Sequence, residues 1–301
     1  MLHAGTDVDC GAFVSTYAQA ALGNSTITEA DLDERLAQQF RVRIRLGHFD
    51  PLGPLDLITP NSTICTDYAI ETSISGMVQS AALLKNLDKT LPLVPGAGAG
   101  TIAVIGPLAN YSEANAGYYG PQNVCGMNYW TAIDAVRKYA DHVVTTPGVP
   151  NATCGWNRKQ KCDAGIPAAV AMAKAVDSVI LVVGTDLKTG SEGIDAKNIS
   201  ITDAQTTLIE QTAAAAKRPI VVLLLTAFPL DISALLSNPK VGAILHTGQP
   251  SVTIMGVAEL LFGKTSPAGR TIQTIYPSSY QDQISVSSFL VLVTLCAWNS
   301  H

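Results

Sequence analysis

The stretch Val179–Asn198, VILVVGTDLKTGSEGIDAKN, decides the fold. Its first five residues are all apolar and mostly β-branched, which predicts a buried parallel strand of four to eight residues. Ligands of open α/β sheets bind beyond the carboxyl ends of such strands. Three carboxylates follow this strand, those of Asp186, Glu192 and Asp195. The loop is therefore either half of an active site or a solvated acidic loop.

Strand-like and helix-like runs alternate on both sides of this stretch. The alternation predicts parallel βαβ units with right-handed crossovers, and therefore an α/β/α sandwich with helices on both faces over residues 96–283. The expected strands are 101–105, 142–146, 178–183, 220–225 and 241–246, and the expected helices are 129–140, 166–176, 204–216 and 254–262.

The regions outside the sandwich have a different character. Residues 1–50 begin with turns and continue as an amphipathic helix, 30–46, which has no core of its own and must pack on something else. Residues 51–95 are expected to form a Pro-rich linker and one helix from about residue 67 to 84. Residues 284–301 form an atypical apolar tail that is too short to span a bilayer, which takes about 20 residues.

Composition limits the function classes. The chain has 301 residues, of which 47 % are hydrophobic and 14 % charged, and its net charge is −5. A folded domain with a sizeable core is expected, and a disordered chain is not. Because no basic stripe occurs, nucleic acid is not an expected partner, and no segment predicts a membrane span.

Cysteines and glycosylation triplets bear on the compartment. Cys154 and Cys162 flank a short polar segment and either close a small disulfide loop or are two separate buried thiols. No CxxC pair occurs, so no metal site is predicted. Five Asn-x-Ser/Thr triplets favour a secreted chain, although residues 1–5 lack the features of a signal peptide. Either a piece of a longer secreted protein or a gene model with a wrong start is expected, and the glycosylation candidates are Asn24, Asn61, Asn110, Asn151 and Asn198.

Two cofactor motifs fail on inspection. The glycine-rich run 96–100 precedes a strand, so no helix N-terminus follows to receive a pyrophosphate. The sequence Gly263-Lys264-Thr265 closes a helix where a P-loop would open one. No cofactor is therefore predicted. His246, at the end of a predicted strand, is either a crevice residue or a structural histidine, the more frequent case.

An ordered series of motifs resembles glycoside hydrolase family 3, in its β-xylosidase-like branch. Residues 4–11 and 45–50 resemble the end of that family's (β/α)8 barrel, so residues 1–50 are expected to be a barrel remnant. Each motif alone is weak, but their order and spacing together are specific. The motifs of the second domain are Ala82–Asn86 with Leu91–Leu93, Ala103–Pro107, Val241–Pro250, Ser266–Arg270 and Tyr276-Pro277.

The resemblance implies a retaining exo-glycosidase. Such an enzyme releases xylose or glucose from the non-reducing end of β-linked oligosaccharides, using one carboxylate as nucleophile and one as general acid/base. The nucleophile would lie in the barrel, before residue 1, so the chain is expected to be inactive alone. The acid/base Glu would lie in the loop Thr185–Asn198, where Glu192 is the candidate and Asp186, Asp195 and His246 are substrate-site candidates.

The loop departs from the family pattern E-x-E-x-x-D-R at two positions. Gly190 stands where the first Glu is expected and Ala196 where the Arg is expected, whereas Glu192 and Asp195 remain. If the first Glu is the essential acid, the chain lacks both catalytic groups, and if Glu192 is the acid, one survives. Two other hypotheses stay open: a sugar-binding or interaction protein without catalysis, and an unrelated flavodoxin-like binding protein.

Overall fold

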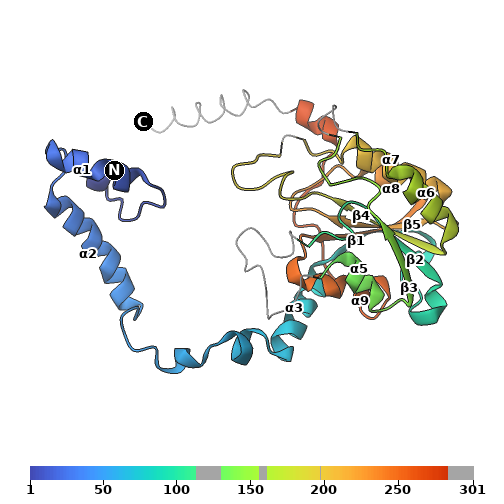
Figure 1. Ribbon diagram of the computed structural model, residues 1–301, viewed down its shortest axis with the longest axis horizontal. Helices are drawn as coiled ribbons and strands as arrows, with labels where there is room; N and C mark the ends of the chain where they lie inside the picture. The colour runs from blue at the N-terminus through green and yellow to red at the C-terminus, as the bar shows by residue number, and fades with distance from the viewer. Residues whose placement is uncertain (113–129, 156–160, 197, 284–301) are drawn as a thin grey trace. The chain divides into compact units, whose positions relative to one another are not determined.

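The computed structural model describes residues 1–112, 130–155, 161–196 and 198–283 (Figure 1). The chain divides into two compact units, Met1–Thr59 and Pro60–His301.

The first unit consists of helices without a core. Helix α1 spans Phe13–Gly23 and helix α2 spans Glu29–Arg45, with short 3-10 turns at Leu2–Ala4 and Gly53–Leu57. A capping box between Thr28 and Asp31 begins α2, because each side chain bonds the other residue's backbone N–H. No residue from 1 to 59 is buried. As predicted, this unit has no core of its own.

The second unit is built on a six-stranded sheet of order β1-β6-β5-β4-β2-β3. Only β1 is antiparallel to its neighbour, and the other pairings are parallel. The prediction of a mostly parallel α/β sheet is therefore confirmed. The strands are β1 Ala82–Asn86, β2 Thr101–Ile105, β3 His142–Thr146, β4 Ser178–Gly184, β5 Ile220–Leu225 and β6 Val241–Gly248.

Helices cover both faces of this sheet (Figure 1). One face packs against α3 Asp67–Ser80, α5 Ala132–Arg137 and α9 Met255–Leu261. The other packs against α6 Ile166–Ala175, α7 Asp203–Ala215 and α8 Ser233–Ser237. Short helical turns lie at Pro60–Ile64, Leu87–Lys89, Gly96–Ala99, Ser251–Ile254 and Ser278–Asp282.

The structure corrects one predicted element. The helix expected to reach Leu84 ends at Ser80, and Ala82–Asn86 forms the edge strand β1 instead. Ala81 has extended backbone angles, φ −67° and ψ 134°, and Ala81 and Ala82 are buried. An apolar run of this length fits a buried helix end or a strand equally well, so tertiary pairing with β6 decides its state.

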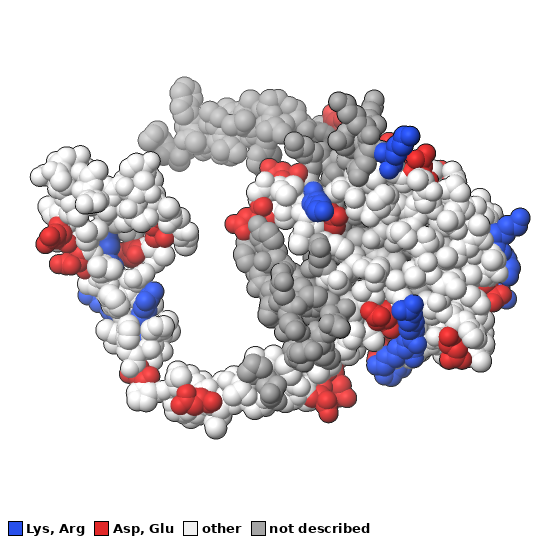
Figure 2. Space-filling view, in the orientation of Figure 1, with Lys and Arg blue, Asp and Glu red and all other residues white. Residues whose placement is uncertain are grey.

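The surface agrees with the low charged content of the sequence. Figure 2 shows Lys and Arg side chains interspersed with Asp and Glu over a mostly uncharged face, without a continuous basic stripe on the side in view. Within the described residues, no helix has both the length and the apolar character that crossing a bilayer requires.

Candidate functional site

The candidate loop leaves the sheet at the carboxyl end of β4, where Gly184 meets β5. A Cβ atom at Gly184 would lie 1.8 Å from the carbonyl oxygen of Leu225, and Gly184 has φ +139°. Only glycine fits such a close approach at a positive φ. The strand-to-loop turn therefore depends on this residue.

Polar side chains from three neighbouring strand ends hold the start of the loop. The Thr185 N–H donates to the carbonyl of Leu225 at 2.9 Å, and the Thr185 hydroxyl lies 3.2 Å from that of Thr226, at the end of β5. The Gln249 amide, just after β6, donates to the Thr185 carbonyl at 3.0 Å. The loop thus starts from a fixed frame at the carboxyl edge of the sheet.

Asp186 shapes the loop from within. It is only 7 % exposed, and its Oδ1 accepts hydrogen bonds from the Lys188 N–H at 3.0 Å, the Thr189 N–H at 3.0 Å and the Thr189 hydroxyl at 2.9 Å. These bonds close an Asx-type turn over residues 186–189. The carboxylate therefore satisfies backbone donors directly after the strand.

Glu192 and Asp195 lie farther out on the same loop, and both are exposed. Ser191 and Ile194 exchange backbone hydrogen bonds of 3.0 and 2.9 Å, which closes a tight turn with Glu192 and Gly193 at its tip. Gly193 has φ +75°, a conformation that favours glycine. The turn presents the Glu192 carboxylate at the surface of the loop.

The two departures from the family pattern lie next to each other in space. A Cβ atom at Gly190 would be 3.5 Å from the Cβ of Ala196 and 3.2 Å from Cε1 of Phe228. A Glu and an Arg at these positions would therefore start from adjacent points, close enough for an ion pair. Relative to that pattern, both charged positions hold small residues here, and a side chain at position 190 would begin next to Phe228.

A buried glutamine that the sequence reading did not single out anchors the base of the loop. Gln205, on α7, is fully buried; its Oε1 accepts from the Gly184 N–H at 2.9 Å, and its Nε2 donates to the Gly184 carbonyl at 3.0 Å. The same Nε2 donates to the carbonyl of Ala152 at 2.8 Å. Helix α7 contains two glutamines, Gln205 and Gln211, and nothing in the sequence indicates that the first of them has these partners.

Ala152 lies two residues before a cysteine that forms a disulfide. Cys154 and Cys162 are joined with an S–S distance of 2.03 Å, and both are buried. Gly155, with φ +104°, packs against the first turn of α7, since a Cβ there would lie 3.2 Å from the Ala204 nitrogen. Gln205 thus bonds the start of the candidate loop on one side and, on the other, the segment that leads into this disulfide.

His246 lies near the carboxyl end of β6, two strands away from β4 along the sheet. It is partly buried, its side chain makes no hydrogen bond with the described residues, and burial lowers its pKa. It lines a cavity of about 160 Å³ together with Thr226, Phe228, Gln249 and residues 271–273 and 275. Phe228 lies near both the cavity and the candidate loop, because a Cβ atom at Gly190 would be 3.2 Å from its Cε1.

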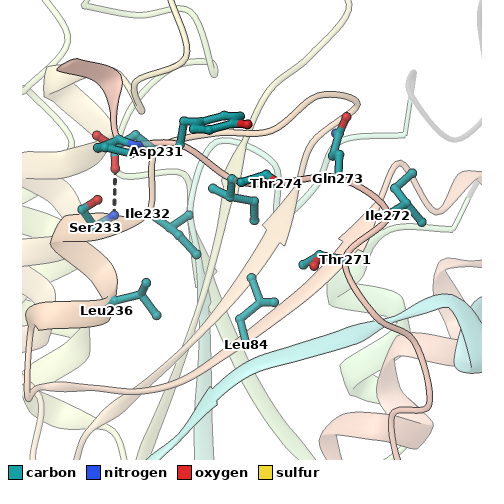
Figure 3. Close-up of a pocket in the computed structure, with 12 residues that line it drawn as sticks. Leu84, Asp231, Ile232, Ser233, Leu236, Thr271, Ile272, Gln273 and Thr274 are labelled. Atoms are coloured by element: carbon teal, nitrogen blue, oxygen red, sulfur yellow. Dashed lines mark hydrogen bonds between the residues drawn. The ribbon is translucent and has the colours of Figure 1, made fainter. Parts of the chain in front are cut away.

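A larger groove of about 670 Å³ lies beside this cavity (Figure 3). Asp231, on one side of the groove, hydrogen-bonds two separate segments. Its Oδ1 accepts from the Ser233 N–H at 2.9 Å, and its Oδ2 accepts from the Ser278 N–H at 2.7 Å. Although partial burial opposes it, hydrogen bonding from Ser233 and Ser278 lowers the pKa of Asp231. The groove is lined by Leu84, Asp231, Ile232, Ser233, Leu236 and residues 271–277.

The glycosylation candidates differ in exposure. Asn24 and Asn110 are exposed, whereas Asn151 and Asn198 are partly buried. The Asn24 Oδ1 accepts the hydroxyl of Thr26 at 2.6 Å, and the Asn151 Oδ1 accepts that of Thr153 at 2.9 Å. The side chain of Asn61 lies outside the described part of the structure. Among the described residues, no three His, Cys, Asp or Glu side chains are grouped as metal ligands.

The acidic loop after β4, the parallel sheet and the motif series point to one family. Residues 81–290 match the model of the glycosyl hydrolase family 3 C-terminal domain. The chain belongs to this family, and its α/β unit is the family's C-terminal domain.

Several relatives with similar sequences are named β-xylosidases. It is 34 % identical to the probable beta-D-xylosidase 7 of Arabidopsis thaliana, covering 93 % of the chain and 36 % of the relative. It is 33 % identical to the exo-1,4-beta-xylosidase bxlB of Emericella nidulans, covering 95 % of the chain and 36 % of that relative. The chain thus spans about a third of the length of these relatives.

Solved structures share the fold. A family 3 exo-beta-xylosidase, XlnD, in complex with a xylobiose aziridine probe has a TM-score of 0.78 and 28 % identity over 95 % of this chain and 35 % of that one. A beta-glucosidase from Listeria innocua has a TM-score of 0.72 at 24 % identity, over 94 % of this chain and 37 % of that one. The second likeness shows the fold alone.

Proposed function

We propose that this chain supplies the acid/base half of a retaining exo-acting glycosidase that releases xylose or glucose from the non-reducing end of β-linked oligosaccharides. The observation that carries the proposal is the ordered acidic loop at the carboxyl end of β4, in a family whose relatives here are named β-xylosidases. The fold positions such a loop at the sheet edge where ligands bind.

Glu192 is the proposed general acid/base. In a retaining hydrolysis, the acid protonates the glycosidic oxygen as the nucleophile attacks the anomeric carbon. The same group, now a carboxylate, then removes a proton from the water that cleaves the glycosyl–enzyme bond, which returns the enzyme to its starting state. The tip turn holds Glu192 outward for both steps, Asp186 maintains the turn at the base of the loop, and Asp195 and His246 remain candidates for contact with sugar hydroxyls.

The nucleophile is proposed to come from a (β/α)8 barrel that precedes this sequence in the parent protein. Residues 1–50 would be the last part of that barrel, which agrees with their exposed apolar side chains, such as Phe13, Phe40 and Ile44. An isolated chain would then hold one catalytic carboxylate and would not hydrolyse glycosides.

A fusion tests the role of Glu192. The barrel of the Emericella nidulans bxlB relative is joined ahead of this chain, and turnover of aryl β-xylosides is measured. Because general acid catalysis contributes about 10²–10⁴-fold, Glu192→Gln should lower the turnover of a substrate with a poor leaving group by about 100-fold, and that of a dinitrophenyl xyloside much less. Glu210→Gln, at an exposed position of α7, is the matched control.

Equal turnover by the fusion and its Glu192→Gln variant would remove Glu192 from the mechanism and shift attention to the position of Gly190. The isolated chain is assayed beside the fusion on nitrophenyl xyloside and glucoside. If the isolated chain turns over either substrate, and Glu192→Gln abolishes that turnover, its proposed inactivity is contradicted.

A second candidate function is sugar binding without catalysis. The paired absence of a Glu at Gly190 and an Arg at Ala196 favours it, because a binding protein does not need those charges. Calorimetry of the isolated chain with xylose, xylobiose and glucose tests this function. Heat that saturates at millimolar sugar would support it, and the absence of heat would count against it.

Secretion of the parent protein is also proposed. The Cys154–Cys162 disulfide and the disulfide-bonded state of Cys65 suit an oxidising compartment. Glycosylation is expected first at the exposed Asn24 and Asn110. After expression behind a secretion signal in a eukaryotic host, peptide mass spectrometry should find glycans at these two sites more fully occupied than at Asn151 and Asn198.

A further inference from the structure

We infer that Gln205 is the positioning residue of the candidate acid/base loop, and that it couples this loop to the segment around Ala152 that leads into the Cys154–Cys162 disulfide. The inference rests on the proposed function, because that proposal makes the loop 184–198 the functional element. It goes further by naming two features outside this loop that hold the loop in position: Gln205 and the segment around Ala152.

Gln205 takes the place of a missing strand neighbour at the end of β4. The pairing of β4 with β2 ends at Ile105 and Leu181, whereas β4 pairs with β5 up to Gly184. Thr185, the next residue, donates to β5, so the backbone N–H and carbonyl of Gly184 face the side that β2 has left. The carboxamide of Gln205 bonds both groups, at 2.9 and 3.0 Å.

The amide geometry is specific to glutamine at this position. A buried backbone N–H needs an acceptor and a buried carbonyl needs a donor, and a carboxamide provides both from one planar group. Nε2 has a second hydrogen, which bonds the Ala152 carbonyl at 2.8 Å. Gln205 therefore uses its acceptor and both donors on backbone groups, and all are excluded from water.

The Ala152 contact extends the coupling to the disulfide. Ala152 is buried two residues before Cys154, and the Cys154 N–H bonds the Asn151 carbonyl at 3.3 Å. The disulfide closes the segment after it, and Gly155 packs on the start of α7. The position of the Ala152 carbonyl is thus fixed from both sides, and Gln205 transmits that position to Gly184.

Hydrogen exchange on the isolated chain tests the inference. Gln205→Met keeps the length of the side chain and removes all three bonds, so amide exchange in peptides covering residues 184–190 should rise by about tenfold or more. Gln79→Met is the matched control, because Gln79 is an exposed residue of α3 whose amide bonds Ser75. Far-UV circular dichroism shows whether each variant is folded.

A second variant provides a readout that a packing role would not move. In Gln205→Glu the ionised carboxylate faces the carbonyls of Gly184 and Ala152, whereas the protonated acid again donates one bond. Exchange in 184–190, corrected for its intrinsic pH dependence, should therefore return towards the wild-type rate as pH falls, and neither wild type nor Gln205→Met should show this return.

The disulfide arm is tested by Cys154→Ala combined with Cys162→Ala. In this double variant, amide exchange at 184–190 should rise less than it does in Gln205→Met. When Gln205→Met is added to the double variant, the further rise in exchange should be a smaller factor than Gln205→Met produces in the wild-type chain. Three results would overturn the positioning role. Exchange at 184–190 could be unchanged in folded Gln205→Met, or it could rise equally over the whole sheet. Alternatively, exchange in Gln205→Glu could show no pH dependence beyond the intrinsic one. Full additivity with the Cys variants would overturn the coupling. No sugar is present in these measurements, so their failure is distinct from failure of the glycosidase proposal.

Discussion

Gly184 and Gly193, two of the glycines in the candidate loop, differ in what a side chain at each position would encounter. Gly184 is restricted both by its φ of +139° and by the Leu225 carbonyl, whereas Gly193 has φ +75° with open space around it. Gly193→Ala should cost about 1 kcal/mol, the strain of a left-handed alanine. Gly184→Ala should cost more than about 3 kcal/mol, because the backbone must also move.

Urea unfolding of the two glycine variants beside wild type measures the difference. Similar costs for Gly184→Ala and Gly193→Ala would show that the sheet edge can adjust around position 184.

The pH dependence of stability is a second expectation at the residue scale. Burial lowers the pKa of His246, so between the folded and unfolded pKa values the unfolded chain binds more protons. The contribution of His246 is therefore fully present above about pH 6.5, the unfolded value, and is lost as pH falls through the folded pKa. His246→Gln should reduce the fall in unfolding free energy between pH 7 and pH 5.

Urea titrations at pH 7 and pH 5 measure that slope. An identical slope in wild type and His246→Gln would contradict the assigned effect of burial.

At the scale of elements, one lysine joins the edge strand to a short helix. The Lys85 Nζ, on β1, donates to the carbonyls of Leu235, Leu236 and Asn238 at 2.8–3.0 Å, around the end of α8. Helix ends leave such carbonyls without internal partners, and a cation there also interacts favourably with the helix dipole.

Lys85→Met should destabilise the chain by about 1–2 kcal/mol, because the aliphatic part is kept while three bonds from a charged donor are lost. Thermal or urea unfolding measures this loss. Lys174→Met, at an exposed site in the last turn of α6, should change the unfolding free energy by less than about 0.5 kcal/mol. Equal effects of the two variants would show that the Lys85 contacts add nothing to stability.

The elements also show what the sequence could predict. Strands β2, β3 and β5 lie at the predicted residues, since continuous apolar runs bounded by turns leave little choice. Strand β1 was mistaken for the end of a helix, because its antiparallel partner is far away in sequence. The five-residue helix α8 was missed, since its capping donor, Lys85, is about 150 residues away.

The same distinction applies to the candidate site. The sequence located the loop and its carboxylates, because they follow a recognisable strand. It did not indicate Gln205, the neighbouring positions of Gly190 and Ala196, or the position of Phe228 beside Gly190. Each of these depends on side chains from separate elements that meet only in the folded chain, and one sequence contains no signal of such pairs.

For the whole molecule, the two units should differ in independent stability. Residues 1–59 contain no buried residue, whereas the unit Pro60–His301 has apolar clusters on both faces of its sheet. Apolar burial is the main favourable term in folding. A chain of residues 60–301 should therefore unfold cooperatively, with a midpoint close to that of the full chain, and residues 1–59 alone should not show a cooperative transition.

Circular dichroism of both pieces during heating measures this difference. A cooperative transition in residues 1–59 would contradict the absence of a core, and the loss of cooperativity in residues 60–301 would show that the first unit stabilises the sheet.

The position of β1 has a consequence for self-association. This strand covers the edge of β6, and it carries two protections against pairing with another molecule: the irregular register between Leu83 and Lys85, and the charge of Lys85 itself. A chain that began at Gly96 would lose this cover, and the backbone edge of the apolar strand β6 would face solvent. Such a chain should form insoluble β-rich aggregates. Strand β1, which lies ahead of the glycine-rich turn, therefore protects the sheet against aggregation.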